Sequence, residues 1–555
     1  NLKDMTSYDS NKAKTYILEN GNYYITAATD AHAAVNNILK EKASTGVANV
    51  NITKMVKSLS ESEAGNKNLV ETYVQEKFDS TTYSTLNGVS ITNQFDGTIL
   101  NDMKQLSRSN WIMMDNAELR YGIVSKNKSD AEINGYQFTH EITPELKAKL
   151  DSRSSLNPNE GNEYLEIELG QNNGVDLIDL RGLDYNDPMW DVLLSQLTIA
   201  ELHKLVTESG YCSPSASSIN KPKVTDLDGP AGLNLVVGHG SVGLGDGYYS
   251  MTWPTEYILA CTWDKTLAYE MGQLIGEDGL YGDVQGWYGP GMNIHRTPFA
   301  GRNFEYYSED SYLSGVFGLM QVSGASSKGM YAFVKHFALN DQETHRDHLG
   351  LITWSNEQTI REIYLKPFEM TIVDNYSEVS YNKPIYDDKL NITGYTYETT
   401  TLPSTFGIMT SFNRIGTTWA GGDYRLITKV LREEWGYNGF VLTDYEVTSY
   451  MHTDQALAAG GDAKLTTVDW GGFSLKDNPE YHKYAYNAAH HILYTVVNSS
   501  GMNGFIHGVV FVNGFAYYKI MLIVADIILL TSIAIVSVKL TKKILKIKKE
   551  EECTI

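Results

Sequence analysis

From residue 187 onward, the hydrophobic positions of the chain follow two alternating patterns. Apolar residues spaced three and four positions apart predict helices, as in residues 187–206 and 423–436. Short runs that are apolar at nearly every position predict buried strands, as in residues 331–339 and 439–446. Strands alternating with helices are typical of a parallel α/β fold, and a TIM-like (β/α)8 barrel fits the length of residues 187–505 best.

Residues 1–151 have a different pattern, in which short β-like runs separate polar loops rich in Asn and Ser. The run from Lys14 to Ala28 predicts two strands joined by a turn at Asn20 and Gly21. Such strands favour an antiparallel β-sandwich with a long polar insertion. Residues 152–186 contain Ser, Asn, Pro and Gly in close succession and predict a linker.

An apolar run of 19 residues, 520–538, lies between Lys519 and Lys539, and its length suits a transmembrane helix. Asp526 opposes insertion by roughly 2.5–3.5 kcal/mol, whereas the twelve Ile, Leu and Val residues favour it by roughly 4–7 kcal/mol in total. Insertion therefore outweighs the alternative, a buried helix of a soluble protein. The lysine-rich tail, 539–555, is expected in the cytoplasm by the positive-inside rule.

This topology predicts a single-pass protein of the cell membrane. Residues 506–519 would be the juxtamembrane segment, and everything before Lys519 would be extracellular.

The composition excludes some partners and leaves others open. A formal charge of −22 makes a nucleic acid an improbable partner, because the two chains repel each other. Three cysteines are too few for a disulfide framework, so stability must come from core burial. The 37 tyrosines and 9 tryptophans suit sugar rings, but core and interface packing would use them equally well.

Several polar residues follow the predicted strands directly. Asp444 ends the run Phe440 to Leu442, and Lys335 with His336 follows the run that begins at Tyr331. In a parallel barrel, active-site residues lie where strands end and loops begin, at the carboxyl-terminal face. These three side chains are therefore candidate active-site residues.

Four segments, in this order along the chain, resemble the barrel domain of glycoside hydrolase family 3. They are DGPAGL at 228–233, GPGMNIHRTPFAGRNFEYYSEDSYLSG at 289–315, VKHFALNDQETHR at 334–346 and GFVLTDYE at 439–446. The resemblance implies that Asp444 is a catalytic nucleophile. It further implies that Asp228, Arg302, Lys335 and His336 hold the hydroxyls of a terminal sugar. For each of these four, a structural ion pair is the alternative.

Further residues have supporting roles in this interpretation. Glu305 is expected to orient Arg302, and Met409 and Trp253 to line the pocket, although core packing would explain the last two equally well. Tyr445 stands where the family usually has Trp, at the wall of the outer subsite. Phe412 stands where the family often has Tyr, and it lacks a hydroxyl that could hydrogen-bond the nucleophile.

Two other motifs are rejected as binding sites. The glycine-rich segment Gly238 to Gly243 has the spacing of a dinucleotide-binding loop, but no clear strand precedes it. His345 and His348 are spaced like metal ligands, but no third ligand is evident. The sequence therefore implies no metal and no organic cofactor.

A retaining glycosidase also needs a proton donor about 5–5.5 Å from the nucleophile. In the family this acid/base residue usually comes from a second α/β domain. Residues 16–42 resemble the fibronectin-III-like domain of members with reversed domain order. We therefore expect residues 1–151 to be a fibronectin-III-like sandwich, and the acid/base residue to lie in a segment before Asn1. Glu446 and Asp341 are the local carboxylates that would have to replace it.

The sequence thus predicts a membrane-anchored, exo-acting, retaining β-glycosidase, most simply a β-glucosidase, whose partner is an oligosaccharide or another β-glycoside. A β-xylosidase of the same family is the alternative enzyme. A catalytically silent sugar-binding surface protein is the alternative from another class. The sequence leaves the oligomeric state open.

Overall fold

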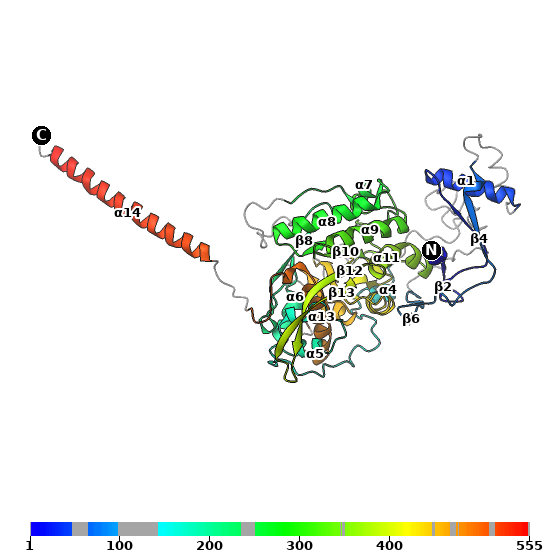
Figure 1. Ribbon diagram of the computed structural model, residues 1–555, viewed down its shortest axis with the longest axis horizontal. Coiled ribbons are helices and arrows are strands. Elements are labelled where there is room, and N and C mark those ends of the chain that lie inside the picture. The colour runs from blue at the N-terminus through cyan, green and yellow to red at the C-terminus, as the bar shows by residue number, and fades with distance from the viewer. Residues whose placement is uncertain are drawn as a thin grey trace. The chain divides into compact units, whose positions relative to one another are not determined.

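The computed structural model divides the chain into two units, Asn1–His507 and Gly508–Ile555, each described by itself (Figure 1). The residues that it describes are 2–46, 65–97, 142–234, 250–344, 346, 350–446, 450–466, 473–474, 477–509 and 517–552.

A seven-stranded sheet forms the centre of the first unit. Its strand order is β18-β17-β14-β10-β9-β8-β7, and all neighbours are parallel except β7 and β8. The strands are β7 (Cys212–Ser213), β8 (Val224–Asp228), β9 (Gly286–Tyr288), β10 (Tyr331–Phe337), β14 (Gly407–Thr410), β17 (Phe440–Tyr445) and β18 (Ala463–Leu465).

The predicted α/β fold is confirmed, but the closed eight-stranded barrel is not. Among the described residues the sheet is open, with β7 and β18 at its two edges. Closure of a parallel barrel requires the first and last strands to hydrogen-bond in parallel, and β7 runs antiparallel to its neighbour. The alternation of helices and strands in the sequence predicts that neighbouring strands are parallel, but it does not show whether the sheet closes into a barrel.

Four helices cover one face of the sheet: α8 (Lys265–Gly282), α9 (Ser311–Ser326), α11 (Lys366–Val373) and η10 (Arg425–Glu434) (Figure 1). Their apolar residues share a core cluster with the side chains of this face, among them Ile275, Phe317, Trp287, Val334, Ile408 and Val441. Helices α8 and α9 approach closely at Gly272, where a Cβ atom would lie 2.0 Å from the carbonyl oxygen of Gln321.

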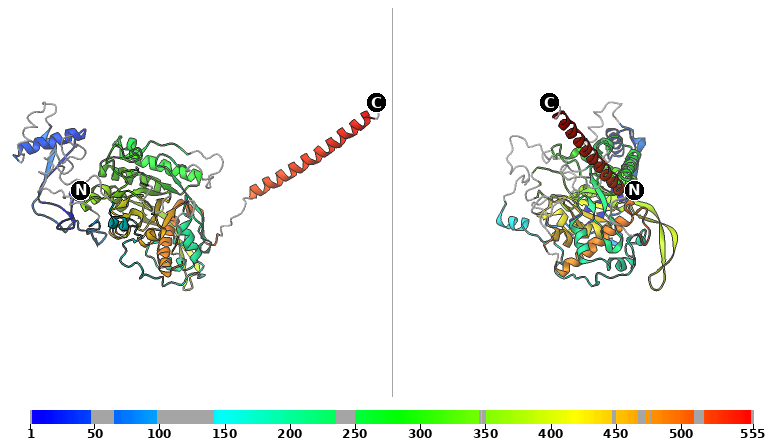
Figure 2. Two further views of the ribbon diagram at one scale, coloured as in Figure 1. Left: turned by 180° about the vertical axis from the view of Figure 1, so that it is seen from behind. Right: turned by 90° about the vertical axis from the view of Figure 1, so that its left-hand side faces the viewer.

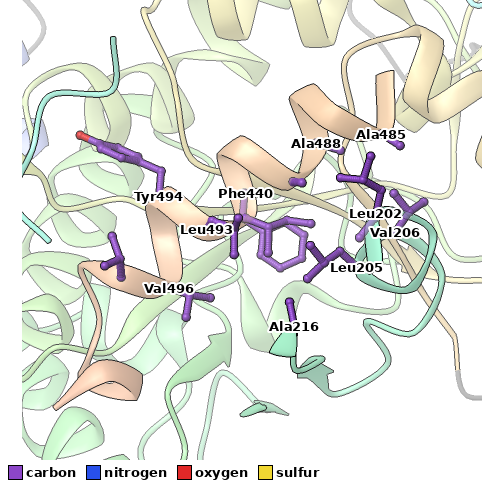
Figure 3. Close-up of a cluster of buried hydrophobic side chains, with 14 of the residues drawn as sticks. Leu202, Leu205, Val206, Ala216, Phe440, Ala485, Ala488, Leu493, Tyr494 and Val496 are labelled. Carbon is purple, nitrogen blue, oxygen red and sulfur yellow. The ribbon is translucent and has the colours of Figure 1, made fainter. Parts of the chain in front are cut away.

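The other face of the sheet packs against helices α6 (Ile199–Thr207) and α13 (Pro479–Val497). Where the sequence predicted one helix over residues 187–206, the structure has two, α5 (Met189–Leu194) and α6. Thr198 and Glu201 form a capping box that starts α6. Figure 3 shows Leu202 and Leu205 of α6 near Phe440 of β17 and Leu493 of α13. All four side chains are fully buried.

The N-terminal region differs from the predicted sandwich. Its described residues form three separate antiparallel pairs: β1 (Ser7–Asp9) with β2 (Thr15–Ile17), β3 (Gly21–Thr26) with β4 (Val70–Gln75), and β5 (Thr85–Leu86) with β6 (Val89–Ser90). The strands on either side of Asn20 exist, but they do not pair with each other. Helix α1 (Ala31–Ser44) lies between β3 and β4 in the chain, so the pairing is long-range.

A buried ion-pair network joins this region to the helices of the sheet. Arg361 bonds to Glu357 at 2.7 Å and to Glu434 at 2.8 Å, and it donates to the carbonyl oxygen of Thr92 at 2.8 Å. The backbone amide of Phe95 donates to Glu357 at 2.6 Å. The segment around residue 92 is therefore fixed to the helical layer.

Residues 152–186, predicted as a linker, are mostly irregular but contribute to the core. Within and beside them lie α4 (Pro144–Leu150), η5 (Leu177–Leu180) and α5 (Met189–Leu194). The side chains of Val175, Leu177 and Leu180 are buried and belong to the same cluster as α6 and α13.

A long hairpin is inserted between α11 and β14. Its strands β12 (Tyr376–Tyr386) and β13 (Ile392–Pro403) pair from Tyr376 with Pro403 to Tyr386 with Ile392. The right-hand view of Figure 2 shows this hairpin as a long ribbon that extends from the sheet and its helices.

The second unit contains helix α14 (Tyr517–Glu552). By length and composition it could cross a membrane, and in the structure it buries none of its apolar residues. The predicted span 520–538 lies inside this helix, which continues without a break through the lysines of the predicted tail.

The remaining short elements connect these parts. They are η1 (Leu2–Met5), η2 (Lys67–Leu69), η6 (Ser217–Ile219), α7 (Glu256–Ala260), η7 (Asn303–Glu305), β11 (Ile352–Thr353), α10 (Glu357–Thr359), η8 (Ile360–Tyr364), β15 (Arg414–Ile415), β16 (Thr418–Trp419), η9 (Ala420–Gly422), α12 (Thr453–Ala458) and η11 (Ser500–Met502).

Candidate active site

Three parallel strands each end in a charged side chain on the same side of the sheet. Asp228 ends β8, Lys335 lies near the end of β10, and Asp444 lies near the end of β17. Side chains alternate along a strand, so Asp444 shares a face with Phe440, and Lys335 shares a face with Phe333. Both phenylalanines belong to the cluster that packs on α6 and α13, so the charged groups continue that face beyond the core.

Asp228 and Lys335 form an ion pair across two strands. The Lys335 Nζ atom donates to the Asp228 Oδ1 atom at 2.8 Å, and the amide of Gly229 donates to the same oxygen at 2.8 Å. Burial opposes the charge of each group. Burial raises the pKa of Asp228, but the charge of Lys335, the hydrogen bonds from Lys335 and Gly229 and the charge of Arg302 together lower it below its ordinary value. Burial lowers the pKa of Lys335, but the charges of Asp228 and Glu305 and the hydrogen bond to Asp228 together raise it. Both groups are therefore ionised at neutral pH.

Arg302 enters the site from the loop that follows β9. It precedes helix η7, and its Nε atom donates to the carboxylate of Glu305, as expected from their spacing in the sequence. Its Nη2 atom lies 2.9 Å from the Nε2 atom of His336. Glu305 thus orients the guanidinium toward the end of β10.

His336 is fully buried and neutral. Burial, followed by the charges of Arg302 and Lys335, lowers its pKa well below the usual value. Since a guanidinium only donates, Nε2 accepts from Arg302 and the ring proton must be on Nδ1, 3.2 Å from the hydroxyl of Tyr306. The backbone amide of His336 donates to Asn293 at 2.7 Å, which fixes the position of the ring.

One carboxylate oxygen of Asp444 accepts a hydrogen bond, and the other has no hydrogen-bond partner among the described residues. Its Oδ1 atom accepts from the amide of Tyr445 at 2.7 Å. Its Oδ2 atom is buried and has no hydrogen-bond partner among the described residues, and it lies 3.6 Å from the Nε2 atom of neutral His336. Burial raises the pKa of Asp444, although the positive charges of Arg302, Arg346 and Lys335 oppose the rise. An open carboxylate oxygen beside several cations is suited to nucleophilic attack.

Arg346 and Glu343 are site residues that the sequence reasoning did not name. The Nε atom of Arg346 donates to Glu343 at 3.0 Å, and the guanidinium carbon lies 4.3 Å from the ring centre of Phe412. Glu343 also lies 3.7 Å from Arg302. Burial raises the pKa of Glu343, against the charges of both arginines. Both residues lie in the segment 334–346, which also contains Lys335, and this position is the sequence signal that could have identified them.

The other candidate residues from the sequence lie in the hydrophobic core clusters or beside cations outside the group around Asp444. Met409 is buried in the core cluster of β14 and β17, and Trp253 packs, partly buried, against the helices of the opposite face. Tyr445 is partly buried against the same cluster as Met409. Asp341 is paired with Arg296 at 3.0 Å, whereas Glu446 lies 3.8 Å from Lys464.

Gly238 to Gly243, His345 and His348 lie outside the described residues. Within the part of the chain that the structure describes, no cluster of three or more His, Cys, Asp or Glu residues could hold a metal ion.

Comparison with known proteins identifies the same part of the chain. The glycosyl hydrolase family 3 N-terminal domain matches residues 217–469. A β-glucosidase of Ruminococcus albus is 30% identical over 270 residues, which cover 46% of this chain and 24% of the relative. β-Glucosidase A of Butyrivibrio fibrisolvens is 29% identical over 328 residues, which cover 59% of this chain and 34% of the relative.

Among solved structures, a β-glucosidase from Paenibacillus barengoltzii matches 90% of this chain and 47% of its own with a TM-score of 0.56 and 20% identity, which supports the fold alone. The chain spans about a quarter of the length of the Ruminococcus albus relative and about a third of the length of the Butyrivibrio fibrisolvens relative. The matched region contains Asp228, Arg302, Lys335, His336 and Asp444. Residues 217–469 of this chain are therefore similar to the N-terminal domain of glycosyl hydrolase family 3.

Proposed function

We propose that this chain hydrolyses terminal β-glycosidic bonds with retention of configuration, with Asp444 as the nucleophile. The observation that carries the proposal is the open Oδ2 atom of Asp444, buried at the carboxyl edge of the sheet beside Lys335, His336 and Arg302. In the first step Oδ2 attacks the anomeric carbon while the aglycone leaves with the bonding electron pair. In the second step water attacks the anomeric carbon, the bond from that carbon to Oδ2 breaks to regenerate the carboxylate, and the proton released by the water neutralises the aglycone anion.

The surrounding groups are suited to hold one sugar ring. Asp228 accepts hydrogen bonds, Lys335 and Arg302 donate them, and their charges are retained at neutral pH. Hydroxyls on adjacent ring carbons need this mixture of donors and acceptors in fixed positions. The ion pairs Asp228–Lys335 and Arg302–Glu305 provide the rigidity, because each partner limits the rotamers of the other.

Asp444 must be ionised to act as nucleophile. Burial works against its ionisation, so the nearby cations are required to keep the carboxylate reactive near neutral pH. Arg346 is one of them, and its position over the ring of Phe412 gives that phenylalanine a role without a hydroxyl. The lack of a phenol at position 412 is thus compatible with an active nucleophile.

We assign the sugar as glucose from the names of the relatives. Both curated relatives are β-glucosidases, but at 30% and 29% identity a β-xylosidase remains the competing assignment. The two activities differ in the hydroxymethyl group at C5 of the sugar. Comparing kcat/KM for an aryl β-glucoside and the matching aryl β-xyloside decides between them.

The mechanism also needs a proton donor for the leaving group, and each carboxyl group considered for this role lies beside a cation. Asp341 and Glu446 lie beside Arg296 and Lys464, and Glu343 lies between two arginines. A neighbouring cation favours the ionised form of a carboxyl group, which has no proton to donate, although burial raises the pKa of Glu343. We therefore propose that the donor for natural glycosides lies outside the described residues, and that aryl glycosides with good leaving groups react without it.

Covalent trapping tests the proposed nucleophile. A 2-fluoro aryl β-glucoside should release its phenol once and leave a fluoroglucosyl ester on Asp444, found by mass mapping of peptides. Asp444→Asn is the matched control, because it keeps the shape of the side chain, removes the attacking oxygen and should therefore carry no label. Label on another residue would contradict the mechanism. Binding of glucoside without any label would favour the catalytically silent sugar-binding protein.

We further propose that helix α14 anchors the chain in the cell membrane with the catalytic unit outside. Its length and apolar composition support the anchor, and the lysines that follow residue 538 support the orientation. Protease added to intact cells should remove the catalytic unit and leave the segment after Lys539 protected. Protection of the catalytic unit would contradict this orientation.

A further inference from the structure

The long hairpin of β12 and β13 lies beside the point where the chain leaves the first unit. His507 is the last residue of that unit, and its Nδ1 atom lies 2.8 Å from the Oδ2 atom of Asp179 in η5. Helix η5 contacts strand β12. A Cβ atom at Gly182, just after η5, would lie 2.3 Å from the ring of Tyr381 in β12. The hairpin and this exit point are therefore neighbours.

The outer half of the hairpin is also close to the exit point. Burial, followed by the negative charge of Asp179, raises the pKa of both Tyr386 and Tyr395. Both hydroxyls are thus within electrostatic reach of the carboxylate that bonds to His507. The end of the ribbon lies near the exit point as well as its base.

Large apolar and aromatic side chains are exposed around the exit point. In the hairpin, Ile385, Tyr395 and Tyr397 are 47%, 51% and 72% exposed, and Ile506, directly before His507, is 65% exposed. We refer to these four residues as the exit residues. Tyr395 and Tyr397 lie two positions apart on β13 and so share a face. Tyrosine is enriched at membrane–water interfaces, where its ring contacts apolar groups and its hydroxyl contacts water.

Only residues 508–516 separate the exit point from α14, the proposed membrane anchor. Even a fully extended chain rises only about 3.3–3.6 Å per residue, so the anchor begins within about 36 Å of His507. A tether of this length keeps the exit residues near the lipid at an effective concentration on the order of millimolar, so that even a weak contact is populated. A second copy of the chain would have no such advantage.

The charge of the hairpin favours a lipid surface without net charge. Residues 376–403 contain more carboxylates than lysines, namely Glu378, Asp387, Asp388 and Glu398 against Lys383 and Lys389. Attraction of basic side chains to anionic headgroups is therefore not the source of the contact. Apolar and aromatic contact with zwitterionic lipid is the source that these residues support, and salt should not weaken it.

We propose that the exit residues rest on the headgroup region of a zwitterionic lipid leaflet. This inference rests on the membrane anchor proposed above. The exit point follows η11, where the backbone amide of Ser500 donates to Gly329 at 2.7 Å, just before β10. Asp444 lies at the other, carboxyl end of the sheet. The contact therefore leaves the candidate active site directed away from the lipid and open to solutes.

Quenching of a fluorescent label by lipid tests the contact. The full chain, with Cys261→Ser and Cys553→Ser, is reconstituted in phosphatidylcholine vesicles, and a single introduced cysteine carries a nitrobenzoxadiazole label; Cys212 is buried. Tyr397→Cys places the label on the hairpin. Phe299→Cys is the matched control, because Phe299 is 91% exposed and lies in the loop that follows β9, at the carboxyl end of the sheet.

We expect phosphatidylcholine with a nitroxide on its headgroup to quench the label at Tyr397→Cys at least about twofold and to leave the label at Phe299→Cys unchanged. Adding Ile385→Ser and Tyr395→Ser should remove most of this quenching, and added salt should not. Equal quenching at the two label positions would overturn the proposal. Emission at Tyr397→Cys that changes with the protein-to-lipid ratio, without quenching, would assign the surface to a second copy and would also overturn it.

Flotation of the same vesicles after an alkaline wash measures the anchor separately. A chain that floats with the vesicles, but shows equal quenching at the two positions, keeps the anchor and refutes the hairpin contact. A chain that the wash removes from the vesicles refutes the anchor, and the contact with it.

Discussion

Asp226 is a buried carboxyl group whose effect on the free energy of unfolding can be worked out and measured. It lies two residues before Asp228 on β8, is fully buried, and accepts a hydrogen bond from the hydroxyl of Tyr331 at 2.5 Å. Its Oδ2 atom has no partner among the described residues. Burial raises its pKa to about 7, against the opposing effects of Tyr331 and Lys221.

The sign and size of the effect on stability follow from this pKa. Between pH 3.8 and about 7 the folded protein keeps a proton that the unfolded chain has lost, so the free energy of unfolding falls as pH rises. The shift of about three pKa units corresponds to about 4 kcal/mol, fully lost above pH 7. Between about pH 5 and pH 7.5, the loss is about 2–3 kcal/mol.

Asp226→Asn should remove this pH dependence, because an amide does not titrate. Urea unfolding of the full chain in detergent, followed by tryptophan fluorescence at about pH 5 and pH 7.5, measures the difference between variant and wild type. We expect the variant to gain about 2–3 kcal/mol relative to the wild type at the higher pH. The shift of buried His336 cancels in this comparison, because Asp226 is not among its causes.

Tyr331→Phe is the control, since it removes the hydrogen bond and leaves the carboxyl group. The loss of the bond raises the pKa of Asp226 further, so the wild-type pH dependence should persist or increase. If Asp226→Asn differs from wild type by the same amount at both pH values, Asp226 does not titrate in this range and the reasoning is refuted.

Three further predictions concern the site and its support. Asp444→Ala should lower kcat/KM for an aryl β-glucoside by about 10⁴-fold, and added azide should restore release of the phenol; unchanged activity would exclude Asp444 as nucleophile. Arg346→Met should raise the pKa of Asp444 further, so that activity is lost at a higher pH as the solution is acidified, whereas Arg346→Lys should keep most of the charge effect. Equal pH–rate profiles for these two variants would contradict that role. Arg361→Met leaves the carboxylates of Glu357 and Glu434 buried without their cation. We expect it to lower the free energy of unfolding by about 3–5 kcal/mol. Urea unfolding at neutral pH measures this loss, with substitution of an exposed lysine, Lys147→Met, as the control.

The position of the candidate nucleophile could be predicted because it depends on local sequence. Phe440, Leu442 and Asp444 alternate on one face of a single strand, and the apolar run defines where that strand ends. The pairing of Arg302 with Glu305 depends on a separation of only three residues. In both cases the residues involved are at most four positions apart, so the sequence alone predicts how their side chains lie relative to one another.

The features that sequence reasoning missed depend on contacts between distant segments. Strand β3 pairs with β4, which follows helix α1, and not with the nearby β2. Arg346 lies over the ring of Phe412, which is 66 positions further along the chain. Residue patterns indicate which side chains are buried, but not which strand or ring they meet. The hairpin of residues 376–403 is different, because its strands have an alternation of more and less exposed positions, which is a local pattern.

That hairpin leaves and rejoins the sheet-and-helix body at one point, since Tyr376 pairs with Pro403. Its strands bond mainly to each other, and their loss would leave the order of the central strands unchanged. Chain length can therefore change at its tip, between Tyr386 and Ile392, without moving Asp444 or Lys335. This tip is therefore a suitable place to insert an epitope or a fluorescent domain without disturbing the proposed active site.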